Sequence, residues 1–254
     1  MSAPSTVWQL DTRHIGRRVL VYNEVDSTNN LAAALAAEPT NDGVAVLASC
    51  QTAGRGQHGR TWQTPAGSAV LLSVLCFPPP AMRRAAILTA WAAVAVCDTV
   101  RETIGIEPAI KWPNDVLVEG KKVCGILTEQ ARGTVVGIGL NVNQTATDFA
   151  TAGLPEATSL CALSGQPFDC GEVAKTLLRH LDAEYGRLRE GNQRTLEGKW
   201  KEHAGLVGCY VQAECVDGVV RGRLLDMGFD GVLLDIGREI RLLVPETVRH
   251  LGPG

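Results

Sequence analysis

One run of twelve residues, 51–62, most constrains the fold, because three glycines, two arginines and a histidine separate two apolar segments there. Glycine has no Cβ, so this backbone can turn sharply and approach a ligand closely. Arginine carries a planar set of donors that suits phosphate and carboxylate oxygens. The run therefore predicts a mobile anion-binding loop that follows a strand. The alternative is a solvated basic turn.

Gly54, Gly56 and Gly59 also match G-x-G-x-x-G, the pattern of dinucleotide-binding folds. That pattern works between a strand and a helix, with an acidic residue roughly 20 positions further on. Residues 64–67, Thr-Pro-Ala-Gly, break any helix, and residues 77–80 supply three prolines instead of an acid. The sequence therefore argues against a nicotinamide site, and it also lacks the phosphate-binding pattern that ends in Gly-Lys-Ser/Thr.

Length and composition set broad limits on the class of protein. The chain has 254 residues with 45% apolar content, enough for one large domain or two unequal ones. Its net charge of −3 argues against a general binder of nucleic acids or membranes. The N-terminus has no apolar signal region, and the longest apolar stretch, residues 85–96, is too short to span a bilayer. We therefore expect a cytoplasmic protein without a membrane partner.

Eight cysteines are present, without a Cys-x-x-Cys pair. A chain of this length needs no disulfides for stability, so we expect the cysteines to be reduced and mostly buried. A metal cluster has little support, because the histidines are far apart in sequence. Cys50 and Cys124 each lie beside a motif.

Hydrophobic patterns predict an α/β (α+β) fold. Strands are expected at residues 44–50 and 69–77, on either side of the loop, and a helix at 85–104 with its apolar side formed by Leu88, Trp91, Val94 and Ala95. A β-hairpin is expected at 110–130 around Glu119-Gly120. A further strand is expected at 134–142, an irregular connection at 145–167 and an amphipathic helix at 170–190.

The sequence pattern changes after Gly205. Four short apolar segments follow, separated by turns that contain Gly or Asp: residues 210–215, 219–226, 231–235 and 239–244. Such spacing is typical of a small all-β barrel. We therefore expect two domains, residues 1–203 and 204–254.

Asp26-Ser27-Thr28-Asn29 precedes an alanine-rich helix that begins near Leu31. Serine at such a position favours an N-cap, and a contact with a polar ligand is the alternative. Further along, Lys111 and Lys122 flank Asp115 within the expected hairpin. Together with the loop arginines, these charges suggest a site for a polyanion, with a divalent cation as a possible companion.

Four segments, in order and in spacing, resemble the biotin protein ligases: Gly54-Arg55-Gly56-Gln57-His58-Gly59-Arg60-Thr61-Trp62, Lys111-Trp112-Pro113-Asn114-Asp115, Lys122-Val123-Cys124-Gly125-Ile126-Leu127-Thr128-Glu129 and Gly137-Ile138-Gly139-Leu140-Asn141-Val142-Asn143. The resemblance runs from about Val19 to the C-terminus. It implies a mixed β-sheet with helices, like the catalytic domain of class II aminoacyl-tRNA synthetases, and a small C-terminal SH3-like barrel.

The resemblance implies a two-step ligase. ATP, with Mg²⁺, activates biotin to biotinyl-5′-AMP, and the biotin is then transferred to a lysine of the biotin carboxyl carrier domain of a biotin-dependent carboxylase. The enzyme is expected to be a monomer or a homodimer. Fewer than twenty residues precede the resemblance, too few for the helix-turn-helix module of some members, so DNA is not expected as a partner. The alternatives are a lipoate-type ligase, a non-enzymatic module of the same fold, and a nucleic-acid binder that uses Arg55, His58 and Arg60.

Residue roles follow from the matched positions of the resemblance. It implies the catalytic residues Lys122, Arg55 and Asp115. For biotin it implies Ser27, Thr28, Asn29, Gln51, Gly54, Arg55, Gly56, Lys122, Gly125 and Leu127. For the nucleotide it implies Arg55, Gln57, Arg60, Trp62, Lys111, Asn114 and Asn141, and it assigns no metal ligand. Gln57 is a departure, since many members carry an arginine there. A glutamine can hydrogen-bond but adds no charge, which bears on how tightly the adenylate is held.

Overall fold

Runs of β-branched and apolar residues form an eight-stranded sheet in the computed structural model, which describes residues 3–130 and 132–254. The strand order is β1-β2-β3-β4-β8-β7-β6-β5. Strands β2 and β3 are parallel, and the other neighbouring pairs are antiparallel, so the sheet is mixed as predicted. The strands are β1 (Thr6–Gln9), β2 (Arg18–Val25), β3 (Ala45–Gln51), β4 (Ala69–Cys76), β5 (Ala109–Lys111), β6 (Asp115–Val118), β7 (Lys121–Gln130) and β8 (Thr134–Asn141).

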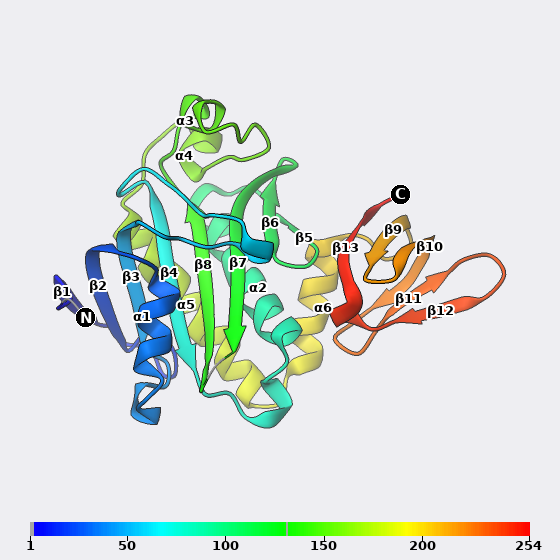
Figure 1. The fold of residues 1–254 in the computed structure, drawn as a ribbon, viewed down its shortest axis with the longest axis horizontal. Helices are drawn as coiled ribbons and strands as arrows, with labels where there is room; N and C mark the ends of the chain where they lie inside the picture. Colours follow the sequence, from blue (N-terminus) through cyan, green and yellow to red (C-terminus); the bar gives the residue numbers. More distant parts are fainter. Residues whose placement is uncertain (1–2, 131) are drawn as a thin grey trace.

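Helices cover the two faces of this sheet unequally (Figure 1). On one face lie α2 (Ala85–Ile104), α5 (Cys170–Arg189) and α6 (Gln193–Ala204). On the other face lie α1 (Thr28–Leu35) and the loop at residues 51–62, which crosses over β8 and β7. The glycine-rich loop therefore lies on the open face of the sheet.

Helix α2 matches its predicted bounds, and the predicted apolar positions Leu88, Trp91, Val94 and Ala95 are buried, but burial extends beyond the one side that they form. Every residue from 87 to 97 is buried. The reason is its position between the sheet and the helices α5 and α6, which contact it from outside. Because all sides of the helix are covered, α2 forms the centre of the main core.

A second sheet follows α6, with five antiparallel strands in the order β12-β11-β10-β9-β13. Its strands are β9 (Tyr210–Cys215), β10 (Gly218–Met227), β11 (Val232–Asp235), β12 (Ile240–Leu243) and β13 (Val248–Pro253). Four of them were predicted, whereas β13 and α6 were missed. The ring centroids of Trp112 and Trp200 lie 5.3 Å apart and those of Trp200 and Phe229 5.5 Å apart, so the two sheets share a continuous apolar core. A division into domains at 203/204 stays a prediction.

Residues 145–167, predicted to be irregular, contain the short helices α3 (Ala146–Thr151) and α4 (Leu160–Ser164). Each is started by side-chain capping, by Thr145 with Asp148 for α3 and by Ser159 for α4. A capping box satisfies amides that a first turn leaves unpaired, so it stabilises helices too short to show a clear period in the sequence.

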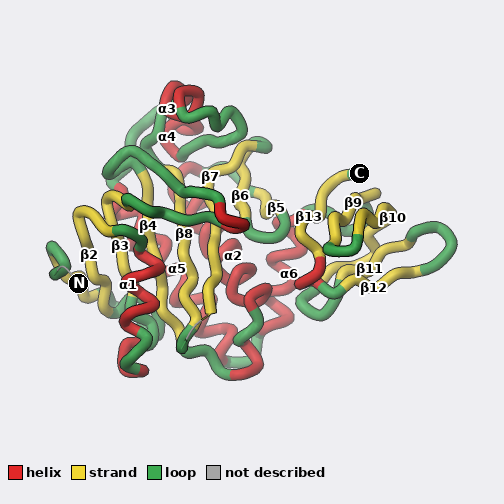
Figure 2. The backbone as a smooth tube through the Cα atoms, viewed as in Figure 1, coloured by secondary structure: helices red, strands yellow, loops and turns green. Residues whose placement is uncertain are grey.

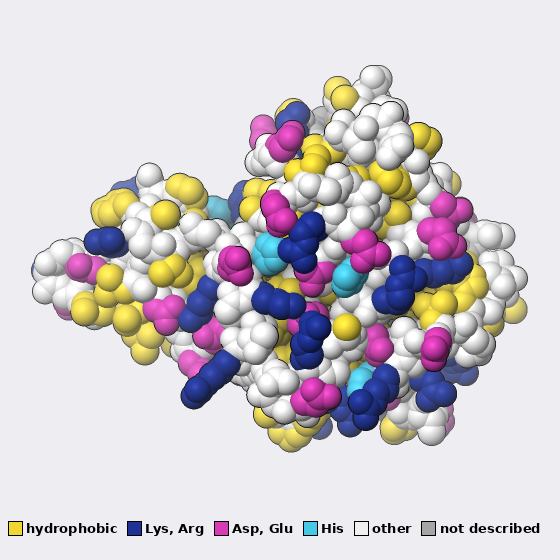
Figure 3. Space-filling model, turned by 180° about the vertical axis from the view of Figure 1, so that it is seen from behind, with side chains coloured by type: hydrophobic (Ala, Val, Ile, Leu, Met, Phe, Trp, Pro, Cys, Tyr) yellow, Lys and Arg dark blue, Asp and Glu magenta, His cyan; other side chains and the backbone are white. Residues whose placement is uncertain are grey.

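The backbone trace places the start of the described chain at the β1 edge of the large sheet and its C-terminus in the second sheet (Figure 2). Viewed from behind, acidic and basic side chains are interspersed, and neither sign forms a continuous patch on that face (Figure 3). None of the described helices has the length and apolarity needed to cross a membrane.

Candidate functional site

A cavity of about 980 Å³ opens on the sheet face that the glycine-rich loop crosses. The loop, the start of α1, the hairpin β6–β7, strand β8 and the second sheet all contribute to its walls. Of the residues predicted for the site, all except Gly54 line it: Ser27, Thr28, Asn29, Gln51, Arg55, Gly56, Gln57, Arg60, Trp62, Lys111, Asn114, Asp115, Lys122, Gly125, Leu127 and Asn141. The separate roles of these residues stay predictions.

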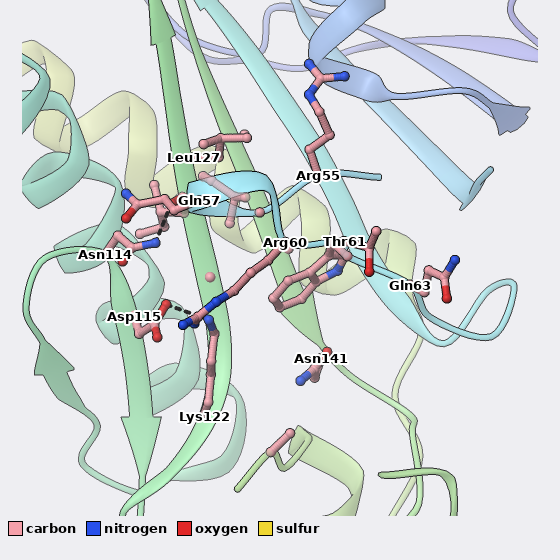
Figure 4. A pocket seen from close by; sticks show the side chains of 18 of the residues that line it. Arg55, Gln57, Arg60, Thr61, Gln63, Asn114, Asp115, Lys122, Leu127 and Asn141 are labelled. Carbon is pink, nitrogen blue, oxygen red and sulfur yellow. Dashed lines mark hydrogen bonds and ion pairs between the residues drawn. The ribbon is translucent and has the colours of Figure 1, made fainter. Parts of the chain in front are cut away.

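The loop is a small hairpin that closes over the cavity (Figure 4). The Gly56 amide donates to the Arg60 carbonyl at 2.7 Å, and the Trp62 amide donates to the Gly54 carbonyl at 2.9 Å. A Cβ on Gly54 would overlap the Trp62 carbonyl oxygen. Gly54 therefore allows the hairpin to close, which explains why it does not line the cavity.

Two glycines of the sheet form a slot for the Trp62 indole. A Cβ on Gly125 would lie 2.9 Å from Trp62 Cζ3, and a Cβ on Gly139 would overlap the same indole. Glycine at both positions therefore lets the Trp62 side chain approach the sheet backbone closely. Trp62 Nε1 is buried and has no hydrogen-bond partner among the described residues. Stacking of Trp62 on adenine stays a prediction.

At another part of the cavity wall, basic side chains surround the carboxylate of Asp115. Lys122 Nζ lies 2.6 Å from Asp115 Oδ1, an ion pair that lacks the angles of a hydrogen bond. Lys111 is the cross-strand neighbour of Asp115, and the Arg60 side chain points toward the pair in Figure 4. Lys122 Nζ also lies 5.6 Å from the centroid of the Trp62 ring. With more cations than carboxylates, this wall suits an anionic ligand.

Ser27 stands at the N-cap position of α1, but its side chain makes no capping hydrogen bond. The prediction that it serves as a cap is therefore wrong. The first-turn amide of Thr28 donates to Gln51 Oε1 at 2.8 Å, so a side chain of β3 takes the place of a local cap. Ser27 is buried and lines the cavity, which agrees with the ligand alternative.

The two predicted nucleotide-binding asparagines are held by the protein itself. Asn114 Nδ2 donates to the Ile126 carbonyl at 2.8 Å and so fixes the β5–β6 turn to β7. Asn141 Nδ2 donates to the Thr158 carbonyl at 3.0 Å, and its Oδ1 accepts from Gln144 at 2.9 Å. Both amides therefore shape the cavity, and their contacts with a nucleotide stay predictions.

Several lining residues were missed by the sequence analysis. Glu214, Arg249 and His250 reach the cavity from the second sheet, and Asp148 and Phe149 come from α3. No local pattern marks them, because their position depends on how separate elements dock. One docking contact is explicit: Trp112 Nε1 donates to the Val248 carbonyl of β13 at 2.9 Å.

All eight cysteines are unpaired. The prediction that they are mostly buried is wrong, because only Cys76, Cys97 and Cys124 are buried, four others are half-buried and Cys209 is exposed. A reduced state stays a prediction. Burial raises the pKa of the Cys124 thiol far above its usual range, against a smaller opposing effect of Lys122. Cys124 is therefore an unreactive core residue, although it lies beside a motif. The described part of the chain contains no group of three His, Cys, Asp or Glu side chains arranged to hold a metal ion.

Residues 21–143 match the model of the biotin/lipoate A/B protein ligase family. The chain is 36% identical over 243 residues to the biotin--[acetyl-CoA-carboxylase] ligase of Mycobacterium tuberculosis, covering 92% of this chain and 90% of that protein. It is 34% identical to the bifunctional ligase/repressor BirA of Bacillus subtilis, covering 89% of this chain and 71% of that protein. The biotin protein ligase of Aquifex aeolicus, solved in complex with biotin and ATP, superposes with a TM-score of 0.80 at 27% identity, covering 93% of this chain and 99% of that one.

Proposed function

Since the chain belongs to the biotin/lipoate A/B protein ligase family, we propose that it is a biotin protein ligase that forms biotinyl-5′-AMP from biotin and ATP and passes the biotin to a carrier lysine. The observation that carries the proposal is one cavity that is lined both by a polar wall at Ser27, Thr28 and Gln51 and by the cationic side chain of Lys122. The relatives favour biotin over lipoate as the acid, because the Mycobacterium protein is named a biotin ligase and the Aquifex ligase was solved with biotin and ATP.

In the first step, a carboxylate oxygen of biotin forms a bond to the α-phosphorus of ATP, the Pα–O bond to the β-phosphate breaks, and pyrophosphate leaves. Negative charge increases on the α-phosphate oxygens in the transition state. Lys122 and Arg60 point toward the same wall, so they supply positive charge that needs no reorganisation. Trp62 lines the cavity beside Lys122, and we expect its indole to help exclude water from the anhydride.

Mg²⁺ is part of this proposal only as a companion of ATP. An ion held mainly by phosphates needs one or two protein carboxylates, and Asp115 supplies one beside Lys122. The residues present therefore fit such an ion, which would neutralise part of the charge on the phosphates.

In the second step, the neutral amine of a carrier lysine attacks the carbonyl carbon of the mixed anhydride, AMP leaves, and the amine loses a proton to form the amide. We propose the carrier domain of a biotin-dependent carboxylase as the partner, because the Mycobacterium relative is named for acetyl-CoA carboxylase. A cytoplasmic location, the oligomeric state and the lack of a DNA partner stay predictions.

The direct test is incubation with biotin, MgATP and a candidate carrier domain, followed by mass spectrometry. We expect one lysine of the carrier to gain the mass of biotin minus water. An equal adduct with lipoate, or an adduct without ATP, would refute the proposed activity.

The loop at residues 54–61 is predicted to be mobile without ligand and ordered with biotinyl-5′-AMP. Ordering a residue costs about 1–2 kcal/mol in backbone entropy, and this segment contains three glycines. An anion supplies charge-assisted partners for the arginines and offsets that cost. Hydrogen exchange should be rapid in the free protein and strongly slowed with the adenylate. Equal protection in both states would show a preformed loop without a gating role.

Trp112→Phe is predicted to impair nucleotide binding as well as stability. It removes the donor to the Val248 carbonyl, and an unpaired buried carbonyl costs about 1–3 kcal/mol. Because Val248 precedes Arg249 and His250 at the cavity, a shift of β13 should raise the KM for ATP by roughly three- to tenfold.

Trp91→Phe is the matched control for this variant. Trp91 Nε1 donates to the Leu181 carbonyl, also at 2.9 Å, but away from the cavity. Thermal denaturation should show similar losses in both variants, whereas only Trp112→Phe should change the KM. An unchanged KM in Trp112→Phe would contradict a role for this contact in the site.

A further inference from the structure

Glu129 lies beside the cavity and contacts two residues that line it, Asn29 and Arg55. Asn29 Nδ2 donates to Glu129 Oε2 at 2.6 Å, and Arg55 Nη2 lies 3.2 and 3.1 Å from its two carboxylate oxygens. Glu129 is on the same face of β7 as Gly125 and Leu127, because alternate residues of a strand share a face. It is not itself a lining residue, so its effect on a ligand must be indirect.

The Glu129 contact is the start of a chain of buried hydrogen-bonding groups. Ser73 Oγ lies 2.5 Å from Asn29 Oδ1 and 2.7 Å from Thr28 Oγ1. Thr28 Oγ1 lies 3.0 Å from Gln51 Oε1, which also accepts from the Thr28 amide at 2.8 Å. This series of hydrogen bonds therefore connects Glu129 to Thr28 and Gln51, which belong to the polar wall of the cavity.

The Glu129 carboxylate determines which group donates and which accepts in this series of hydrogen bonds. A carboxylate only accepts, so Asn29 must present its NH₂ group to Glu129 and its carbonyl oxygen to Ser73. At the other end, Gln51 must present its carbonyl oxygen to the Thr28 amide. Both ends are thus acceptors, and the hydroxyls of Ser73 and Thr28 supply one proton each. These two protons serve three oxygen–oxygen contacts: Asn29 to Ser73, Ser73 to Thr28 and Thr28 to Gln51. One of these contacts therefore has no proton, and an oxygen in this series can accept a hydrogen bond from a ligand.

We propose, on the basis of the proposed function, that Glu129 is a positioning residue that makes this wall select a ligand with N–H donors, such as the ureido ring of biotin. By orienting Asn29 it leaves an acceptor at Thr28 or Gln51 for the ligand. By pairing with Arg55 it also holds the start of the loop against β7. A glutamine at this position could accept or donate, so Asn29 would be free to turn and the shortage of donors would disappear.

The test measures biotin-dependent exchange of pyrophosphate into ATP in the full chain. Glu129→Gln is expected to raise the KM for biotin about tenfold, while the KM for ATP at saturating biotin stays within about twofold. Glu129→Asp keeps the charge and the acceptor character, so it should restore most of the affinity. Glu172→Gln, at an exposed ion pair on α5, is the matched control and should behave like the wild type.

A biotin analogue methylated on its ureido nitrogens adds a readout that a general loss of structure would not produce. The wild type should prefer biotin strongly, and Glu129→Gln should lose most of that preference. Gly137→Ala is a second variant, since a Cβ there would overlap the Asn29 amide and displace the same group from β8. It should give the same selective rise in the KM for biotin.

Two results would overturn the inference: a biotin KM in Glu129→Gln within twofold of the wild type, or an equal rise in the KM values for biotin and ATP. Absence of biotin-dependent exchange in the wild type is a different outcome, because it would refute the proposed function itself. If the wild type is active and Glu129→Gln leaves the KM for biotin unchanged, only the positioning role is refuted.

Discussion

Lys122→Ala is expected to lower the rate of adenylate formation at least about 10²-fold while the protein stays folded. Lys122 is the cation that forms an ion pair with Asp115, and its side chain is 32% exposed, so it can still reach a ligand. Removing a preorganised charge next to the developing phosphate charge costs on the order of 3 kcal/mol or more in the transition state. The loss should be in the maximal rate of pyrophosphate exchange more than in the KM for biotin.

Lys121→Ala provides the control for this experiment. Lys121 is the preceding residue of β7, is exposed and does not line the cavity, so its removal changes the net charge equally. It should leave the exchange rate unchanged. An exchange rate in Lys122→Ala within threefold of the wild type would remove Lys122 from the reaction, whatever the control shows.

Local signals in the sequence predicted much of the fold. The bounds of α2, the β6–β7 hairpin around Glu119-Gly120 and four strands of the second sheet follow from hydrophobic period and turn chemistry, which act between near neighbours in the chain. The predicted cavity residues also come together, because they belong to segments with clear motifs. The class of fold and the family were therefore accessible before the structure.

Contacts between distant segments could not be predicted. The capping prediction for Ser27 is wrong because Gln51, more than twenty residues later, accepts the Thr28 amide. The lining residues Glu214 and Arg249 depend on the docking of the second sheet through aromatic stacking, which no local pattern encodes. Glu129 had one signal, an acid within an apolar strand, but its partner Asn29 is a hundred residues away.

Gly139 of β8 likewise contacts a residue that is distant in the sequence, Trp62. Gly139→Ala is expected to lower adenylate formation by roughly 10²-fold, because displacement of a group by about 1 Å in an active site can cost that much. The added Cβ would overlap the Trp62 indole, and the backbone of β8 cannot move away, since it is hydrogen-bonded between β4 and β7. The indole must therefore leave its slot and take the end of the loop with it.

Gly198→Ala separates this effect from a general response to a new methyl group. Gly198 lies within α6 with nothing within 4 Å of an added Cβ, so alanine should leave activity unchanged and stabilise the helix by about 0.5–1 kcal/mol. In Gly139→Ala, overpacking should lower stability by about 1–3 kcal/mol. Fluorescence of the tryptophans should shift as the indole becomes exposed. Full activity with an unshifted spectrum would show that the slot tolerates a methyl group, and closure of the cavity by Trp62 would then need another explanation.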